Sequence, residues 1–188
     1  MRTGDESYDY SLQRSLRDKF NNLFYVLGHC PESEQEQKIE ELNEIIDEMD
    51  GSAIHWTFTK DLFNKMDKMI EEKKLSMENA IVLLKHLGHR AVLVGYLCSK
   101  LRDSSLRKRI EKMIIEENEK KEGRKEKLMI DLCESYLLLS ATEIFEELFP
   151  ISVPCLLNVA LKKEGNEKTQ KEVEVALLAL SCIDKYEV

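Results

Sequence analysis

Two apolar runs, PCLLNVAL (Pro154–Leu161) and TQKEVEVALLALSCI (Thr169–Ile183), decide the fold class of this chain of 188 residues. In both runs apolar residues recur every three or four positions, as they do when one face of an α-helix packs on a core. The initial proline suits the first turn of a helix, and Thr169 with Glu172 has the spacing of a capping box. A polar turn around Gly165 separates the runs, so the stretch predicts two consecutive helices.

The same alternation of amphipathic run and helix stop extends towards the N-terminus. Five of the seven glycines follow such a run, where a left-handed residue commonly ends a helix. They are Gly28, Gly51, Gly88, Gly123 and Gly165. No segment alternates β-branched and polar residues as a strand does. We therefore expect one all-α domain over residues 1–188, with about ten helices.

Residues near the expected helix starts indicate where the chain enters each helix. Ser33, followed three residues later by Glu36, predicts a capping box that opens an acidic helix over residues 33–50. Thr59 is placed to cap the next helix, and Phe58 and Phe63 on either side of it have the spacing of a hydrophobic staple.

Residues 154–183 resemble one unit of an armadillo or HEAT repeat. Such units pair two helices and place small residues where Ala176 and Ala179 stand, before a finish similar to the one at Leu180–Ile183. The glycines at 88, 123 and 165 are spaced 35 and 42 residues apart, broadly similar to the period of about 40–47 residues in these repeats. The resemblance implies stacked antiparallel helix pairs in a right-handed superhelix, with a binding surface for proteins.

The acidity of the chain belongs to one segment. Between Glu32 and Asp50, nine acids stand against one base, Lys38, which gives −8, equal to the net charge of the whole chain. The sequence pI is near 5.2, and no basic groove with interleaved aromatic residues is visible, so we expect no nucleic-acid partner. The acidic helix either serves solubility, faces a basic partner or lies over the bases of its own fold.

A basic cluster is the strongest feature of opposite sign, and it overlaps a charged helix and turn over residues 105–127. We take its members, together with one earlier arginine, as the candidate partner-binding residues: Arg90, Lys100, Arg102, Arg107, Lys108, Arg109 and Lys112. They could bind an acidic peptide or another anionic group. The alternative is a solvated helix face, which is what most charge runs are.

No constellation of residues indicates catalysis, a cofactor or a metal. His86 and His89 are three residues apart, but Gly88 is expected to end the helix between them, and no further ligand follows at a suitable spacing. His29 and Cys30 lack a strained turn or an oxyanion site. Phosphate-binding, nucleophile-elbow and zinc-protease motifs do not occur.

The remaining composition favours a cytoplasmic protein. No apolar run reaches the roughly 18–20 residues that span a bilayer, and the first residues are acidic, without the apolar region of a secretory signal. The five cysteines form an odd set without a C-x-x-C pair, which is typical of buried thiols in a reducing compartment.

The sequence thus favours a non-enzymatic protein–protein interaction module, similar to an adaptor or scaffold, that binds a protein or peptide on a solenoid surface. Two alternatives stay open. One is an all-α enzyme or enzyme subunit with a pocket between helices, for which a deep pocket lined by His86, His89 and buried acids would be the sign. The other is a structural helical bundle that self-associates.

Overall fold

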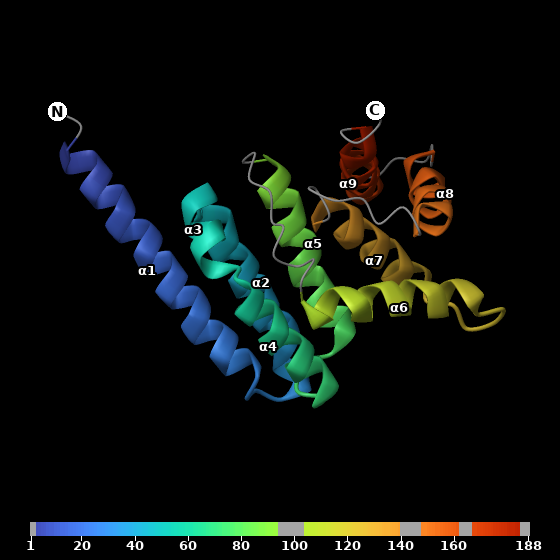
Figure 1. Ribbon diagram of the computed structural model, residues 1–188, viewed down its shortest axis with the longest axis horizontal. Helices are drawn as coiled ribbons and strands as arrows, with labels where there is room; N and C mark the ends of the chain where they lie inside the picture. Colours follow the sequence, from blue (N-terminus) through green and yellow to red (C-terminus); the bar gives the residue numbers. More distant parts are fainter. Residues whose placement is uncertain (1–2, 94–103, 140–147, 162–166, 185–188) are drawn as a thin grey trace.

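The computed structural model describes residues 3–93, 104–139, 148–161 and 167–184. Every regular element within these ranges is an α-helix, and there are nine of them (Figure 1). They are α1 (Thr3–Leu27), α2 (Glu32–Glu48), α3 (Gly51–Thr57), α4 (Lys60–Glu71), α5 (Met77–Leu93), α6 (Ser105–Glu119), α7 (Glu126–Leu139), α8 (Phe149–Ala160) and α9 (Glu167–Asp184). The predicted all-α class is confirmed. None of these helices is both long and apolar enough to cross a bilayer.

The helices pack in two rows. In the first row, α2 packs on α5, α5 on α7 and α7 on α9, while α1 covers the other side of α2. In the second row, α4 packs on α6 and α6 on α8. Helices consecutive in the chain also pack together across the rows, as α6 does on α7 and α8 on α9. Figure 1 shows α1, α2, α5 and α7 following one another from left to right, with α9 above α7.

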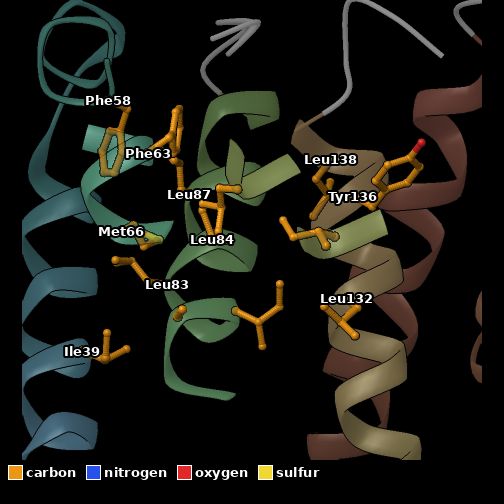
Figure 2. Packing of buried hydrophobic residues seen from close by; sticks show 14 of the residues in the cluster. Ile39, Phe58, Phe63, Met66, Leu83, Leu84, Leu87, Leu132, Tyr136 and Leu138 are labelled. Carbon is orange, nitrogen blue, oxygen red and sulfur yellow. The ribbon is translucent and has the colours of Figure 1, made fainter. Parts of the chain in front are cut away.

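The hydrophobic core takes residues from each of the nine described helices, and α5 lies near its centre (Figure 2). Leu83, Leu84 and Leu87 of α5 are fully buried, and they face Phe63 and Met66 of α4 on one side and the buried residues of α7 on the other. Burying one such leucine contributes about 1.5–3 kcal/mol, so α5 is held from several sides at once. This burial of α5 agrees with the many apolar residues in its sequence.

Two of the expected glycine stops are wrong. α5 continues through Gly88, which is buried, to Leu93. A glycine inside a helix costs about 1 kcal/mol relative to alanine, and the buried leucines beside it outweigh that cost. Gly51 does not end α2 either, because α2 stops at Glu48. It is the first residue of the unpredicted helix α3, because the Asp50 side chain accepts a hydrogen bond from the Ala53 N–H at 2.9 Å and caps that helix.

The predicted caps have mixed outcomes. Thr59 caps α4 as expected, with its hydroxyl 3.2 Å from the Leu62 N–H. The expected staple rings of Phe58 and Phe63 lie 6.3 Å apart between centroids. Ser33 is not a cap, since α2 begins at Glu32 behind an extended proline.

The two helices predicted from the C-terminal runs both begin earlier than expected. α8 starts at Phe149, so Pro154 lies inside the helix and not in its first turn. α9 starts at Glu167, so Thr169 lies inside it and is not its cap. Gly165 falls outside the described residues. Among the described glycines, Gly123 adopts a left-handed conformation, with φ of 72°.

Neutral side-chain amides hold the N-terminal helices together. The Gln35 side chain of α2 donates to the Lys74 carbonyl at 2.7 Å and accepts from the Ser76 N–H at 3.2 Å, at the turn between α4 and α5. The Gln13 side chain of α1 accepts from the Asp50 N–H at 2.8 Å, at the start of α3. Both glutamines are buried, so these contacts satisfy backbone groups that would otherwise lie unpaired in the interior.

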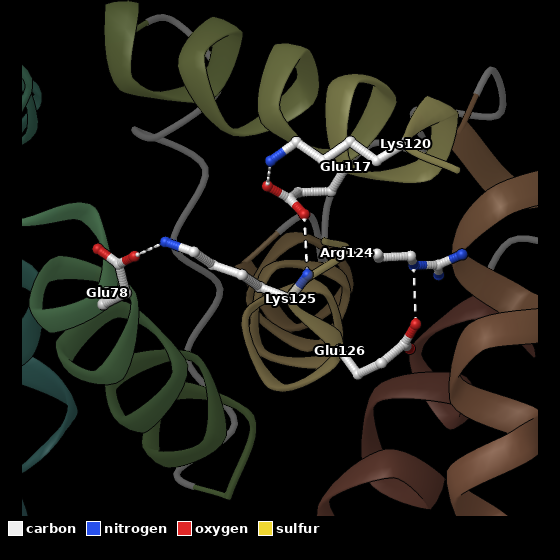
Figure 3. A network of polar contacts seen from close by, with 6 residues as sticks. All are labelled: Glu78, Glu117, Lys120, Arg124, Lys125 and Glu126. Carbon is white, nitrogen blue, oxygen red and sulfur yellow. Dashed lines mark hydrogen bonds and ion pairs between the residues drawn. The ribbon is translucent and has the colours of Figure 1, made fainter. Parts of the chain in front are cut away.

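Charged contacts instead join α5, α6 and α7 (Figure 3). The Lys125 ammonium lies 2.9 Å from the Glu78 carboxylate of α5. The buried Glu117 carboxylate of α6 binds the Lys120 ammonium and accepts from the Lys125 N–H at 3.2 Å. The hydrogen bond from Lys120 lowers the pKa of Glu117, against the opposing effect of burial. Glu117 therefore fixes the turn that leads from α6 into α7.

Candidate functional site

An open groove of about 570 Å³ lies where α2, α5, α7 and α9 meet. α5 forms its central wall with Lys85, His86, His89 and Arg90, and the other three helices contribute mainly charged side chains. The groove thus lies along the first row of helices. Its lining residues come from positions 43 to 175 of the chain, so the tertiary packing creates it.

A group of three charges, in which two buried carboxylates bind a partly buried lysine, lies at the α5–α7 side of the groove. The Lys85 ammonium is 3.0 Å from an Asp131 oxygen and 2.8 Å from a Glu134 oxygen. The Asp131 side chain is 9% exposed and that of Glu134 is 1% exposed. Burial raises the pKa of Glu134, and Lys85 opposes this effect. Burial also disfavours the charged Lys85, yet the two carboxylates outweigh it and raise the Lys85 pKa.

Both histidines of α5 line the groove. His86 Nε2 lies 2.6 Å from an Asp47 oxygen of α2. The His89 pKa is lowered, first by burial and then by the positive potential of His86 and Lys171. A lowered pKa favours the neutral imidazole near pH 7. Because α5 does not stop at Gly88, the two imidazoles share one continuous helix, contrary to the expectation from the sequence.

The candidate partner-binding residues that the structure describes lie on two separate helices, α5 and α6. Arg90 lies in the groove, where its guanidinium donates to the Met49 carbonyl at 3.1 Å. The described remainder of the basic cluster lies on α6, in the second row of helices, and Lys100 and Arg102 fall outside the described residues.

On α6, most of the basic side chains contact acids of the same protein. Arg107 pairs with Glu111 at 2.7 Å, and Lys112 lies 3.8 Å from Glu116. Arg109 joins α6 to α4 through Asp67 at 2.6 Å, and Lys108 is exposed. These contacts give Arg109 a structural role between two helices.

Among the described residues, the acidic helix does not lie over the bases of the cluster, which are on α6. α2 packs between α1 and α5. Within the described part of the chain, its side-chain ion pairs join Glu41 to Lys38 and Asp47 to His86.

The sequence pattern did not indicate Lys85, Asp131 or Lys171 as site residues. A signal for Lys85 was present, because it interrupts the apolar run from Ile81 to Leu87. A charge inside such a run requires a buried partner of opposite sign. Which acid supplies that partner follows only from the packing of α7. Among the described residues, no three His, Cys, Asp or Glu side chains form a group that could hold a metal ion.

No protein-family model, curated protein or solved structure matches the chain. The structure itself defines an all-α protein with nine helices in its described part.

Proposed function

We propose that this chain is a non-enzymatic protein–protein interaction module that binds a segment of a partner protein in the groove across α2, α5, α7 and α9. One observation carries the proposal: four helices from one row, far apart in the sequence, contribute side chains to one continuous groove. Helical solenoids build their binding surfaces from successive helices in this way.

The two-row packing also supports a finer proposal on the architecture. We infer that α4 with α5, α6 with α7 and α8 with α9 are irregular armadillo- or HEAT-like pairs of a right-handed superhelix. Each of these pairs packs internally, and each packs on the next pair through both of its helices. Most contacts thus join neighbouring pairs, as in stacked repeats, although α5 also contacts α9.

The chemistry of the groove suits a peptide segment that carries both charges. Exposed Lys127 and Lys171 line it together with Glu172 and Glu174, and Val82 and Val175 add apolar surface. Long charged side chains around an apolar patch select a partner by charge and set its orientation. The groove offers no single sign of charge, so we expect a segment of mixed charge.

The test compares two charge-matched double variants in affinity capture from the native cell. Lys127→Glu with Lys171→Glu alters the groove, whereas Lys108→Glu with Lys112→Glu alters the basic cluster on α6 to the same extent. We expect the groove variant to capture at least tenfold less of the partner than the unaltered chain does. The α6 variant should capture as much as the unaltered chain. Loss in the α6 variant alone would place the partner on the basic cluster instead.

The salt dependence of the capture is a second reading of the same experiment. Exposed charges act over about 8–10 Å at physiological ionic strength and over shorter distances at high salt, so capture should weaken at 0.5 M salt. Retention of the partner by both double variants would refute the assignment to the groove.

A second candidate function is an acid–base enzyme that uses the same groove. Two separate observations favour it. The 2.6 Å contact with Asp47 orients the His86 imidazole, and the lowered pKa of His89 favours its neutral form, which can accept a proton as a general base. A panel of model esters, phosphoesters and peptides tests it. Turnover that His89→Gln abolishes would favour the enzyme, whereas binding of the captured partner without turnover would favour the interaction module.

A further inference from the structure

A second groove, of about 540 Å³, lies between α1 and α2. α1 lines it with Lys19, Asn22, Leu23 and Val26, and α2 with Glu41, Glu44, Ile45 and Glu48. The lining residues of α2 differ from Asn43 and Asp47, which line the first groove. At about 100° per residue, the two sets lie roughly a third of a turn apart around the helix, so α2 serves two separate grooves.

Apolar side chains form the floor of the α1–α2 groove. Leu23 and Ile45 are half-buried and pack against the hydrophobic core. Val26 is 43% exposed. Because Leu23 and Val26 lie three residues apart, they occupy one face of α1 and leave an apolar strip open to a binding partner.

Glutamates form the wall of this groove on α2. Glu41, Glu44 and Glu48 are spaced three and four residues apart, so they lie along one edge of the helix. Of these three, Glu41 has a basic neighbour, Lys38 at 3.8 Å, while Glu44 and Glu48 have none within 4.0 Å among the described residues. Lys19 is the one base in the lining.

This arrangement is unfavourable for α2 on its own. Like charges three or four residues apart destabilise a helix by about 0.2–0.5 kcal/mol per pair. Acids near a helix C-terminus also oppose its dipole, and the last turn of α2 has no base. Positive charges brought by a partner would relieve both effects.

We propose that the α1–α2 groove binds a basic amphipathic helix of a partner protein. The apolar face of that helix packs on Leu23, Val26 and Ile45, and its lysines or arginines pair with Glu44 and Glu48 along the wall. This is helix-in-groove recognition, in which apolar anchors supply affinity and flanking charges supply selectivity. The inference uses none of the residues that carry the proposed function, so either can fail without the other.

The probe is a fluorescent 14-residue peptide with leucines at helical spacing and lysines on both flanks, measured by fluorescence anisotropy with the full chain. Two further peptides are controls. One replaces each lysine by glutamate, and the other keeps the composition but scrambles the spacing of the leucines. We expect the basic amphipathic peptide to bind at least tenfold more tightly than either control.

Two triple variants of α2 locate the binding. Glu41→Gln, Glu44→Gln and Glu48→Gln neutralise the groove wall and should weaken binding at least tenfold. Glu32→Gln, Glu34→Gln and Glu36→Gln remove the same charge from the other end of the helix. They should change the dissociation constant of the peptide less than twofold. Both triple variants keep the apolar face of α2, and circular dichroism confirms that they fold.

The apolar floor needs a variant of its own. Val26→Ser should weaken binding about fivefold without changing its salt dependence, because Val26 contributes apolar area and no charge. Equal weakening by the two triple variants would overturn the proposal, because it would show attraction to the net charge alone. Equal binding of the scrambled peptide, or no binding of the basic peptide, would overturn it as well.

Discussion

Replacing Lys85 by methionine removes the ammonium that lies 3.0 Å from Asp131 and 2.8 Å from Glu134. Methionine has a similar length and fills a similar volume, so the change leaves the packing of α5 on α7 nearly intact. The two carboxylates keep their burial but lose their counter-ion. Breaking a buried ion pair in this way costs about 3–5 kcal/mol, a large share of the roughly 5–15 kcal/mol that stabilises a typical domain.

A second lysine–glutamate pair on α5 provides a matched control. Lys125, directly before α7, lies 2.9 Å from Glu78 of α5, at nearly the distance found at Lys85, but these side chains are 60% and 53% exposed. Exposed ion pairs contribute about 0–1 kcal/mol. Lys125→Met should therefore lower the free energy of unfolding by well under 1 kcal/mol, and the difference between the two variants isolates the effect of burial.

The difference in stability between Lys85→Met and the unaltered chain should also depend on pH, in a direction that the pKa of Glu134 determines. Burial raises the pKa of Glu134 even with Lys85 in place, and removing Lys85 also removes the charge that opposes this rise. A carboxyl group whose pKa is raised in the folded protein stabilises the fold most at pH values below its ordinary pKa. This contribution is lost as pH rises through the raised pKa. The stability gap between Lys85→Met and the unaltered chain should therefore narrow from pH 8 to pH 5.

Urea unfolding followed by circular dichroism at 222 nm measures these free energies. A rescue variant, Lys85→Met with Asp131→Leu and Glu134→Met, replaces the whole group by apolar side chains and should recover at least half of the loss. The reasoning is wrong if Lys85→Met loses no more stability than Lys125→Met at pH 8. A stability gap that stays constant between pH 8 and pH 5 would also refute it.

Three further outcomes are expected in the same unfolding assay. Lys73, which follows the C-cap residue Glu72 of α4, has φ of 60°. Lys73→Gly should therefore raise the free energy of unfolding by about 0.5–1 kcal/mol, because glycine adopts this conformation without strain. Thr59→Ala should cost about 1 kcal/mol by removing the cap of α4, whereas Ser33→Ala, at a position that caps nothing, should stay within about 0.5 kcal/mol. Because Lys120 lowers the pKa of Glu117, Glu117 contributes stability above its ordinary pKa that is lost as pH falls through the lowered value. Glu117→Gln should therefore destabilise the fold by about 1 kcal/mol at pH 7. Below pH 4.5 the variant should lose less stability on further acidification than the unaltered chain does.

Local periodicity was enough to predict the class of the fold and the position of most helices. It works because a helix repeats every 3.6 residues whatever it packs against. The helix boundaries depend on more than local pattern. Gly88 looks like a helix stop on propensity alone, but the leucines around it are buried between neighbouring helices. Gly51 looks like the end of α2, but Asp50 begins a new helix there.

The groove across α2, α5, α7 and α9 could not be predicted, because no sequence spacing relates its residues. Asp47, His86 and Asp131 meet only when three helices are packed in their final order. The one usable signal was Lys85, a charge in an otherwise apolar run. It indicates a buried ion pair but names neither the partner nor the surface around it. The acidic segment was visible in the sequence, while the apolar floor of the α1–α2 groove was not.

The glutamine contacts of the N-terminal helices differ in one physical respect from the charged contacts further along the chain. An amide neither titrates nor responds to ionic strength, so the contacts of Gln13 and Gln35 hold equally at pH 3 and pH 8. Those of Glu78 and Glu117 depend on ionised carboxylates, whose pKa values are lowered by the hydrogen bonds from Lys125 and Lys120. Acid should therefore weaken the contacts among α5, α6 and the start of α7 first, while the amide contacts of α1 and α2 persist.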